Sequence, residues 1–145
     1  MEKTVYRKWH DFLGMPKKSI EWHRQDVADE YAELDKARGP INRWSEYSDV
    51  VYTVTRARWG GYAMDSPLSR RAFIYGSLYM FPKYTLRYLF FRQAGKKLHA
   101  TRPLHEVRNP QKTHKIHYVA NKYELDPAKF AAVCKKQLRY WPLLK

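Results

Sequence analysis

The sequence predicts a mainly α-helical protein, a single compact domain of five or six helices with a helix-turn-helix-like hairpin at residues 113–140. Three observations favour this class. Apolar residues recur at helical spacings of three, four and seven along much of the chain. Proline and glycine divide the chain into segments of helical length. A composition of 44% hydrophobic and 16% aromatic residues over 145 positions supplies one core and excludes a disordered tail.

Two helices are expected in the first half of the chain. The first covers residues 19–37, because Ser19 is a good N-cap and Gly39 with the following proline ends the apolar pattern. The second covers residues 44–58, which carry a long stripe of apolar residues at helical spacing. The run VVYTVT within it also suits a strand, since β-branched and aromatic residues favour strands. We therefore expect a helix there and keep a strand as the alternative.

The first expected helix carries acidic residues on the side opposite its apolar stripe. A solvated helix face is the simpler interpretation. The alternative is that this face mimics an acidic ligand and lies over the basic half of the chain until it is displaced. The residues concerned are Asp26, Asp29, Glu30, Glu33 and Asp35.

Two more helices are expected in the middle of the chain. Residues 67–81 begin with Ser66 as the N-cap and a proline at the first helical position. This segment is apolar nearly all round, which predicts a buried helix, and Pro82 is expected to break it. Residues 83–94 form the next helix, closed by Gly95.

The last third of the chain contains an irregular stretch and a helical hairpin. Residues 96–112 hold two prolines and show no clear period, so we expect no regular structure there. Helices are expected at about 113–123 and 127–140, joined by a very short turn. Asp126 is expected to cap the second of these helices, and Pro127 to occupy its first position.

The spacing within this hairpin resembles that of helix-turn-helix DNA-binding units in general. Such a unit needs a small residue inside the first helix and apolar residues that lock the second helix onto the first. Glu124 stands at the turn position that commonly holds glycine, which weakens a left-handed turn there. A plain helical hairpin that only packs the core is the alternative. The positions that carry the resemblance are Ile116, Ala120, Leu125, Phe130 and Val133.

The outward positions at the start of the second helix carry little that can read a base. Direct readout needs Arg, Lys, Asn or Gln, and only Lys129 meets that need among residues 127–132. Farther along, Lys135, Lys136 and Arg139 suit phosphates, which position a protein without reading sequence. The resemblance therefore implies binding with weak or shape-based sequence specificity.

The excess of positive charge lies entirely in the second part of the chain. The formal net charge is +14, from 28 basic and 14 acidic residues. Residues 1–65 hold 11 of each sign, whereas residues 66–145 hold 17 basic and 3 acidic residues. Solubility needs only about 2–8 net charges on a small domain. The neutral first part and the basic second part therefore predict a surface for a polyanion.

Aromatic residues alternate with cations over residues 70–97. Exposed rings beside cations can stack the bases of a single strand, but aromatics at helical spacing more often form a core, which we expect here. The cations must then project at the rim of this core. The residues expected to bind nucleic acid are Lys129, Lys135, Lys136 and Arg139, with Lys83, Arg87, Arg92, Lys96 and Lys97 extending the surface.

We expect no catalytic residues, metal or cofactor. The phosphate-cradling loop, the nucleophile elbow and paired carboxylates are absent from the sequence. A zinc enzyme using His105, His114 and His117 is the minority alternative, since zinc needs about four ligands. The single cysteine, Cys134, excludes a disulfide framework and is expected to be buried and unreactive.

The function expected from the sequence is a small, basic, non-enzymatic nucleic-acid-binding protein located inside the cell, with DNA and RNA both open. No secretory signal or transmembrane segment is expected. The alternative is an adaptor or inhibitor, virus-encoded or an accessory subunit of a larger complex, whose basic surface binds an acidic protein. Trp9, Trp22 and Trp141 would be its anchors.

Overall fold

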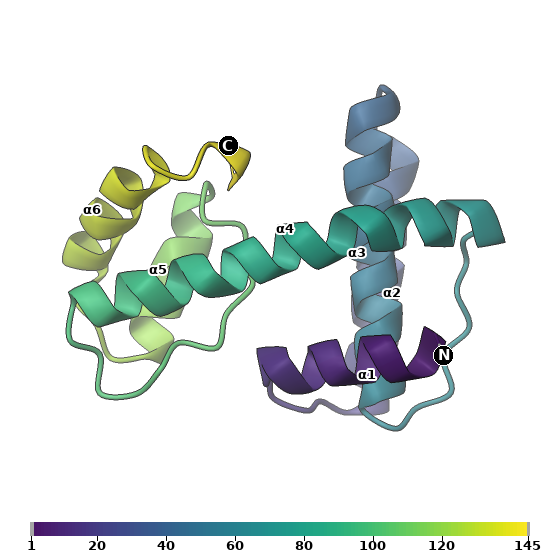
Figure 1. Ribbon diagram of the computed structural model, residues 1–145, viewed down its shortest axis with the longest axis horizontal. Coiled ribbons are helices and arrows are strands. Elements are labelled where there is room, and N and C mark those ends of the chain that lie inside the picture. The colour runs from purple at the N-terminus through teal and green to yellow at the C-terminus, as the bar shows by residue number, and fades with distance from the viewer. Residues whose placement is uncertain (1, 145) are drawn as a thin grey trace. The chain divides into compact units, whose positions relative to one another are not determined.

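The computed structural model describes residues 2–144, with side chains from residue 5 onward, and all regular elements in this range are helices (Figure 1). The predicted mainly α-helical class is therefore confirmed, and the strand alternative for residues 44–58 is wrong. The elements are α1 (Glu2–Leu13), α2 (Ile20–Lys36), α3 (Pro40–Trp59), α4 (Arg70–Lys97), α5 (Thr113–Lys122), α6 (Pro127–Leu138) and the short 3-10 helix η1 (Pro142–Leu144).

The chain divides into two compact units at the Pro82–Lys83 bond. Unit 1 contains α1, α2, α3 and the first part of α4. Unit 2 contains the second part of α4, the irregular residues 98–112, α5, α6 and η1. That the two units belong to one domain stays a prediction.

Helix α3 is the buried centre of unit 1. The side chains of Val50, Val51 and Val54 are fully buried, and α2 and α1 both pack against this helix, with α2 lying along it (Figure 1). A helix covered on several sides needs apolar residues around most of its circumference. The β-branched run that also suited a strand is therefore explained by burial, since stiff branched side chains fill a tightly packed interior.

The expected start of α2 is confirmed, whereas α3 begins earlier than expected. The Ser19 hydroxyl accepts a hydrogen bond from the Trp22 backbone N–H at 3.2 Å, which is the predicted N-cap. Helix α3 begins at Pro40, four residues before the expected start, with Gly39 as its N-cap at a φ of +80°. Proline suits the first helical position because that position needs no backbone N–H.

Helix α4 differs from its prediction at three points. It begins at Arg70, because the Ser69 hydroxyl rather than that of Ser66 accepts a hydrogen bond from the first turn. Pro82 lies inside the helix, so the predicted break is wrong. Proline carries a helical φ, but it removes one backbone hydrogen bond and its ring crowds the carbonyl four residues earlier, at a cost of about 3 kcal/mol that packing along a long helix can offset. Gly95 also lies inside, and α4 ends at Lys97.

The first part of α4 is buried on one face only, so the prediction of a fully buried helix is wrong. Tyr75 and Leu78 are 56% and 62% exposed, whereas Phe73 and Met80 are buried. The buried face approaches α3 closely at Gly76, where an added Cβ would lie 2.7 Å from the Tyr47 carbonyl oxygen. Glycine therefore sets the distance between α3 and α4 within unit 1.

The core of unit 2 joins the second part of α4 to the C-terminal hairpin. Residues 98–112 are irregular, as predicted, and contribute the buried Leu104 to this core. The remaining buried members come from three helices and the chain end. They are Phe90, Phe91 and Ala94 on α4, Ile116, Val119 and Ala120 on α5, Tyr123, Phe130 and Cys134, and Leu144 of η1.

Replacing Gly76 by alanine should destabilise the protein despite the better helix propensity of alanine. The new methyl group would meet backbone atoms of Tyr47 and the side chain of Val51 at less than 3 Å. Overpacking of this kind costs about 1–3 kcal/mol, against a propensity gain of roughly 1 kcal/mol. Thermal and urea unfolding of G76A should therefore show a lower free energy of unfolding. An unchanged or raised value would contradict the close approach of the two helices.

Candidate nucleic-acid interface

The C-terminal hairpin has the packing that its sequence predicted. Ile116, Ala120 and Phe130 are buried between α5 and α6, while Leu125 and Val133 are half-buried. All five positions of the spacing therefore take part in holding the two helices together, although burial alone does not distinguish a DNA-binding hairpin from a plain one.

The turn of the hairpin is left-handed at Glu124, where the sequence lacked the usual glycine. The φ of Glu124 is +57°, which costs a non-glycine residue about 1–2 kcal/mol. The next residue returns the chain to the core, since the Leu125 N–H donates to the Ala120 carbonyl at 2.9 Å. Asp126 then caps α6 by accepting from the Lys129 N–H at 2.9 Å, and Pro127 occupies the first position, both as predicted.

The basic residues predicted on α6 are all exposed. Their spacings of three, six and seven place them within one arc of the helix, away from the buried side chains of Phe130, Cys134 and Gln137. We name this arc the α6 basic face. Its members are Lys129, Lys135, Lys136 and Arg139.

The structure divides the cations predicted on α4 into two groups. Lys96 and Lys97 are exposed in the last helical turn. Lys83, Arg87 and Arg92 are half-buried and cover tyrosine rings of the same helix. The Arg87 guanidinium lies 5.3 Å from the ring centre of Tyr84, and that of Arg92 lies 5.7 Å from the ring centre of Tyr88. The two half-buried arginines thus contribute to packing through cation–π contacts as well as to charge.

The aromatic residues of this stretch are mainly core, as expected. Tyr84, Tyr88, Phe90 and Phe91 are buried. They are therefore unavailable as a platform for stacking bases. The exposed exception, Tyr75, lies in unit 1.

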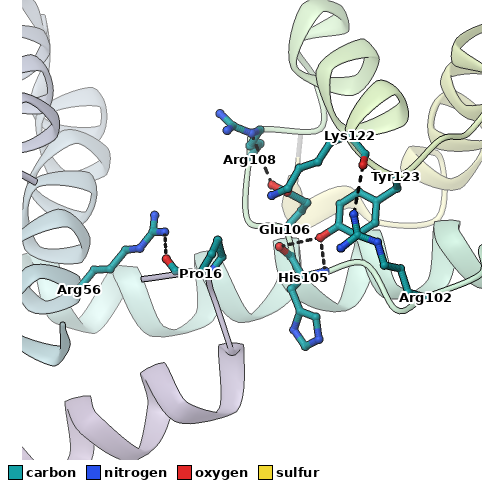
Figure 2. A network of polar contacts seen from close by, with 8 residues as sticks. All are labelled: Pro16, Arg56, Arg102, His105, Glu106, Arg108, Lys122 and Tyr123. Carbon is teal, nitrogen blue, oxygen red and sulfur yellow. Dashed lines mark hydrogen bonds and ion pairs between the residues drawn. The ribbon is translucent and has the colours of Figure 1, made fainter. Parts of the chain in front are cut away.

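A buried ion-pair network lies beside the hairpin, and the sequence did not predict it (Figure 2). Glu106 is only 1% exposed. The Lys122 ammonium lies 2.6 Å from one Glu106 carboxylate oxygen, and the Arg108 Nε lies 3.4 Å from the other. A buried carboxylate requires such partners, because an unpaired charge is costly away from water. The signal in the sequence is slight, a single acid after 40 residues that contain none.

Tyr123 fixes the backbone next to this network. Its hydroxyl accepts a hydrogen bond from the His105 N–H at 3.0 Å and lies 3.4 Å from the His105 carbonyl oxygen (Figure 2). The irregular segment before α5 is thereby attached to the end of that helix. Residues that appear unordered from their sequence are held in a defined position.

The histidines of the zinc alternative do not come together. Within residues 5–144, we find one group of three or more potential metal ligands that lie close together, and it consists of glutamates in unit 1. His105 is half-buried with its ring 5.9 Å from that of Tyr88, while His114 and His117 are exposed on α5. Cys134 is buried as expected, and burial raises the pKa of its thiol to about 12. The buried neutral thiol is a poor nucleophile.

The acidic face of α2 is partly buried rather than fully solvated. Glu30 and Asp26 are half-buried where α2 packs along α3, and Glu46 and Asp49 of α3 face them. Carboxylate oxygens of Glu30, Glu33 and Glu46 lie within 4.8 Å of one another. Burial, together with these like charges, raises the pKa of Glu30 to about 8. Glu30 therefore carries a proton at neutral pH.

Unit 1 also buries two neutral histidines and an arginine. His10 lies 2.9 Å from the Thr55 hydroxyl oxygen, and burial, followed by the charge of Arg56, lowers its pKa to about 3. The same two causes lower the pKa of His23. Arg56 donates to the Pro16 carbonyl at 2.8 Å (Figure 2). Protonating either imidazole would place two positive charges together in the interior.

The tryptophans proposed as anchors mostly serve packing. Trp9 and Trp141 are half-buried, and Trp22 is at the edge of exposure, with the Arg56 guanidinium 4.8 Å from its ring centre. A different tryptophan is more open. The indole of Trp44 donates to the Tyr75 carbonyl at 2.6 Å, and each of these two residues has an exposed apolar residue three positions away on its own helix. We define the α3–α4 apolar patch as Ile41, Trp44, Tyr75 and Leu78.

A cleft of about 780 Å³ is the other notable feature of unit 1. Its walls include Arg7 and Arg58, but also Asp11 and Asp65. Asp11 accepts a hydrogen bond from the Trp59 indole at 2.8 Å. The mixed charge of this lining does not favour a polyanion, in contrast to the α6 basic face.

Comparison with known proteins found no matching protein family, curated protein or solved structure. Among the residues that the structure describes, we find no helix with the length and apolar character required to cross a bilayer.

Glu30→Gln should stabilise the protein at alkaline pH. A carboxyl group whose pKa rises from 4.5 unfolded to about 8 folded stabilises the fold below pH 4.5, and this contribution is lost as pH rises through 8. The variant keeps the neutral shape and removes the titration. One pKa unit corresponds to about 1.4 kcal/mol, so a pKa change from 4.5 to about 8 predicts a gain of several kcal/mol at pH 8.5, at most about 5, and little gain at pH 5. Urea unfolding at both pH values measures it, with Asp35→Asn as an exposed control.

His10→Gln should reduce the loss of stability in acid. A histidine whose pKa falls from 6.5 unfolded to about 3 folded contributes stability above pH 6.5, and this contribution is lost as pH falls through 3. Wild-type protein should lose on the order of 2 kcal/mol more than the variant between pH 7.5 and pH 5. Urea unfolding at these pH values tests it. An equal loss in both proteins would show that His10 is protonated in the fold.

Proposed function

We propose that this protein binds nucleic acid without catalysing a reaction, and that the α6 basic face grips backbone phosphates. The observation that carries the proposal is the exposure of Lys129, Lys135, Lys136 and Arg139 along one arc of α6. Exposed cations at this density attract a polyanion and release its counterions. Lys96 and Lys97 at the end of α4 extend the positive surface of the same unit.

The acids of unit 2 do little to oppose this field. Glu106 is buried and paired with two cations, and the carboxylate of Asp126 is occupied as a helix cap. Glu124 is exposed at the turn. Three acidic residues follow residue 65. Among the residues that the structure describes, Glu124 is the one of these three that is exposed and takes no part in a helix cap or an ion pair.

The proposed binding is weakly selective for sequence. The exposed side chains at the start of α6 include Ala128, Lys129 and Ala132, and only the lysine can donate to a base edge. Recognition helices that specify sequence carry several donors and acceptors at these positions. We therefore expect duplexes of different sequence to bind with similar affinity.

Duplex binding should weaken steeply with salt. Each phosphate contact contributes a slope of roughly −0.9 to the dependence of log K on log salt, so the four residues of the α6 basic face predict a slope of about −3 to −4. Fluorescence anisotropy with a labelled duplex, between about 50 and 200 mM salt, measures this slope. Affinity that stays flat across this range would exclude the proposed function.

Charge reversal of Lys135 and Lys136 to glutamate should reduce duplex affinity at least tenfold, roughly, since charged hydrogen bonds are worth about 1.5–3 kcal/mol each. The matched control reverses Lys17 and Lys18, an adjacent and exposed lysine pair in unit 1. The control should keep most of the affinity. Equal losses in the two variants would show that binding follows total charge and not the α6 basic face.

A protein-interaction adaptor is the second candidate, and the α3–α4 apolar patch favours it. Its Trp44 and Tyr75 are the residue types enriched at binding hot spots. The exposed Arg43 directly precedes Trp44, and the exposed Arg71 lies one helical turn before Tyr75. An acidic protein with an apolar anchor would match this surface. Purified protein that carries nucleic acid, removable by high salt, favours the first function. A stoichiometric protein partner lost in Trp44→Ala, but not in Trp22→Ala, favours the second.

A further inference from the structure

A small cleft lies at the C-terminal end of α4, within unit 2. Its volume is about 140 Å³, and it is lined by the last turns of α4 and by the segment from Ala100 to Leu104. Pockets that enclose a whole small molecule measure roughly 300–1,000 Å³. This cleft therefore suits one small chemical group of a larger ligand.

The charged residues that line the cleft are all basic. Arg92 and Lys96 reach it from α4, and Arg102 and Thr101 reach it from the loop. Arginine and lysine bring donors, the threonine hydroxyl adds another, and the lining holds no acidic residue. Most of the surface of the cleft is apolar, but all of its charged side chains are cations, so a charged group bound there must be an anion.

Arg102 is held in place before any ligand arrives. Its guanidinium lies 4.4 Å from the ring centre of Tyr123, and it donates to the Lys122 carbonyl at 3.2 Å (Figure 2). Tyr123 is itself buried and fixed by the backbone of His105. Binding therefore costs little further loss of side-chain freedom at Arg102. Its planar fork also matches the oxygens of a phosphate.

The acid that follows this segment in sequence is occupied elsewhere. Glu106 is buried and pairs with Lys122 and Arg108. Because its carboxylate already pairs with these two cations, it does not neutralise Arg102 in place of an external anion. The cations of the cleft keep their positive field for an external anion.

We propose that this cleft binds a single phosphate group, with Arg102 as the central ligand and Arg92 and Lys96 beside it. The inference rests on the proposed function for the source of that phosphate, which is the backbone of a bound nucleic acid. Arg102 is absent from the residues predicted by the sequence. The cleft adds an enclosed contact to the open contacts of the α6 basic face.

Substitution of Arg102 should distinguish phosphate binding in the cleft from attraction by the overall positive charge of the unit. Arg102→Gln should weaken duplex binding roughly tenfold and reduce the magnitude of the salt slope by about one, as expected for one lost phosphate contact. The matched control is Lys112→Gln, an exposed lysine of the same unit outside the cleft. It should change affinity less than twofold, roughly, as a rim charge. Equal effects of the two substitutions would overturn the proposal, while salt-dependent wild-type binding would leave the proposed function standing.

Two further variants guard against a folding defect. Lys96→Gln removes an exposed cation of the cleft and should weaken binding in the same direction as Arg102→Gln. Arg102→Lys keeps the charge without the planar fork and should recover part of the affinity. Thermal unfolding must show all variants folded at the temperature of the binding assay. Unchanged binding by folded Lys96→Gln and Arg102→Gln together would count against the cleft.

Inorganic phosphate tests the cleft without nucleic acid. Backbone amide shifts of Thr101 and Arg102 should respond to millimolar phosphate at constant ionic strength in wild-type protein, and not in Arg102→Gln. If duplex binding is absent but these shifts occur, the proposed function fails and the phosphate cleft stands. If wild-type protein shows no such shifts, the cleft is not a phosphate site whatever the duplex assay gives.

Discussion

The rotation of α6 about its own axis is the constraint on which the C-terminal unit depends. Near the start of the helix, the Phe130 ring stacks against that of Phe91, with 6.3 Å between ring centres. Two turns later, the buried Gln137 amide donates to the Phe90 carbonyl at 2.8 Å. These contacts, seven residues apart, fix the same face of α6 against α4. The opposite arc of α6 must therefore face solvent, and its lysines are exposed.

The two units use their acidic residues in different ways. In unit 2, acids serve the fold, because Glu106 organises two cations and Asp126 starts a helix. In unit 1, acids gather between α2 and α3, where burial together with their like charges raises the pKa of Glu30 enough for it to keep its proton at neutral pH. The effective charge of unit 1 is thus more positive than its residue count indicates. The formal net charge of +14, which counts Glu30 as ionised, therefore understates how positive the protein is.

The sequence predicted the local structure well where a residue contacts only the helical turn that it begins. Ser19 and Asp126 cap helices as expected, because a cap needs only the three residues that follow it. The same reasoning placed a break at Pro82 and was wrong. A single proline removes one hydrogen bond, and packing over the rest of a long helix decides whether the helix continues.

The candidate site was predictable to the extent that it depends on helical periodicity. The exposed arc of α6 follows from the spacing of Phe130 and Val133, which must face the core. The position of Arg102 does not follow from any local pattern, because it is set by a ring 21 residues later in the chain. The burial of Glu106 depends equally on Lys122, which lies 16 residues away on another element. Contacts of this range exist only once the core has formed.

The buried cysteine gives this protein an internal reporter of its own opening. Cys134 is the single thiol in the sequence and lies between α6 and the rest of the core. With a pKa of about 12, it offers almost no thiolate to a reagent while the unit is closed. The rate at which a thiol-specific dye attaches therefore follows the separation of α6 from the core. Labelling of Cys134 can thus measure how often the hairpin opens under native conditions, without an introduced cysteine.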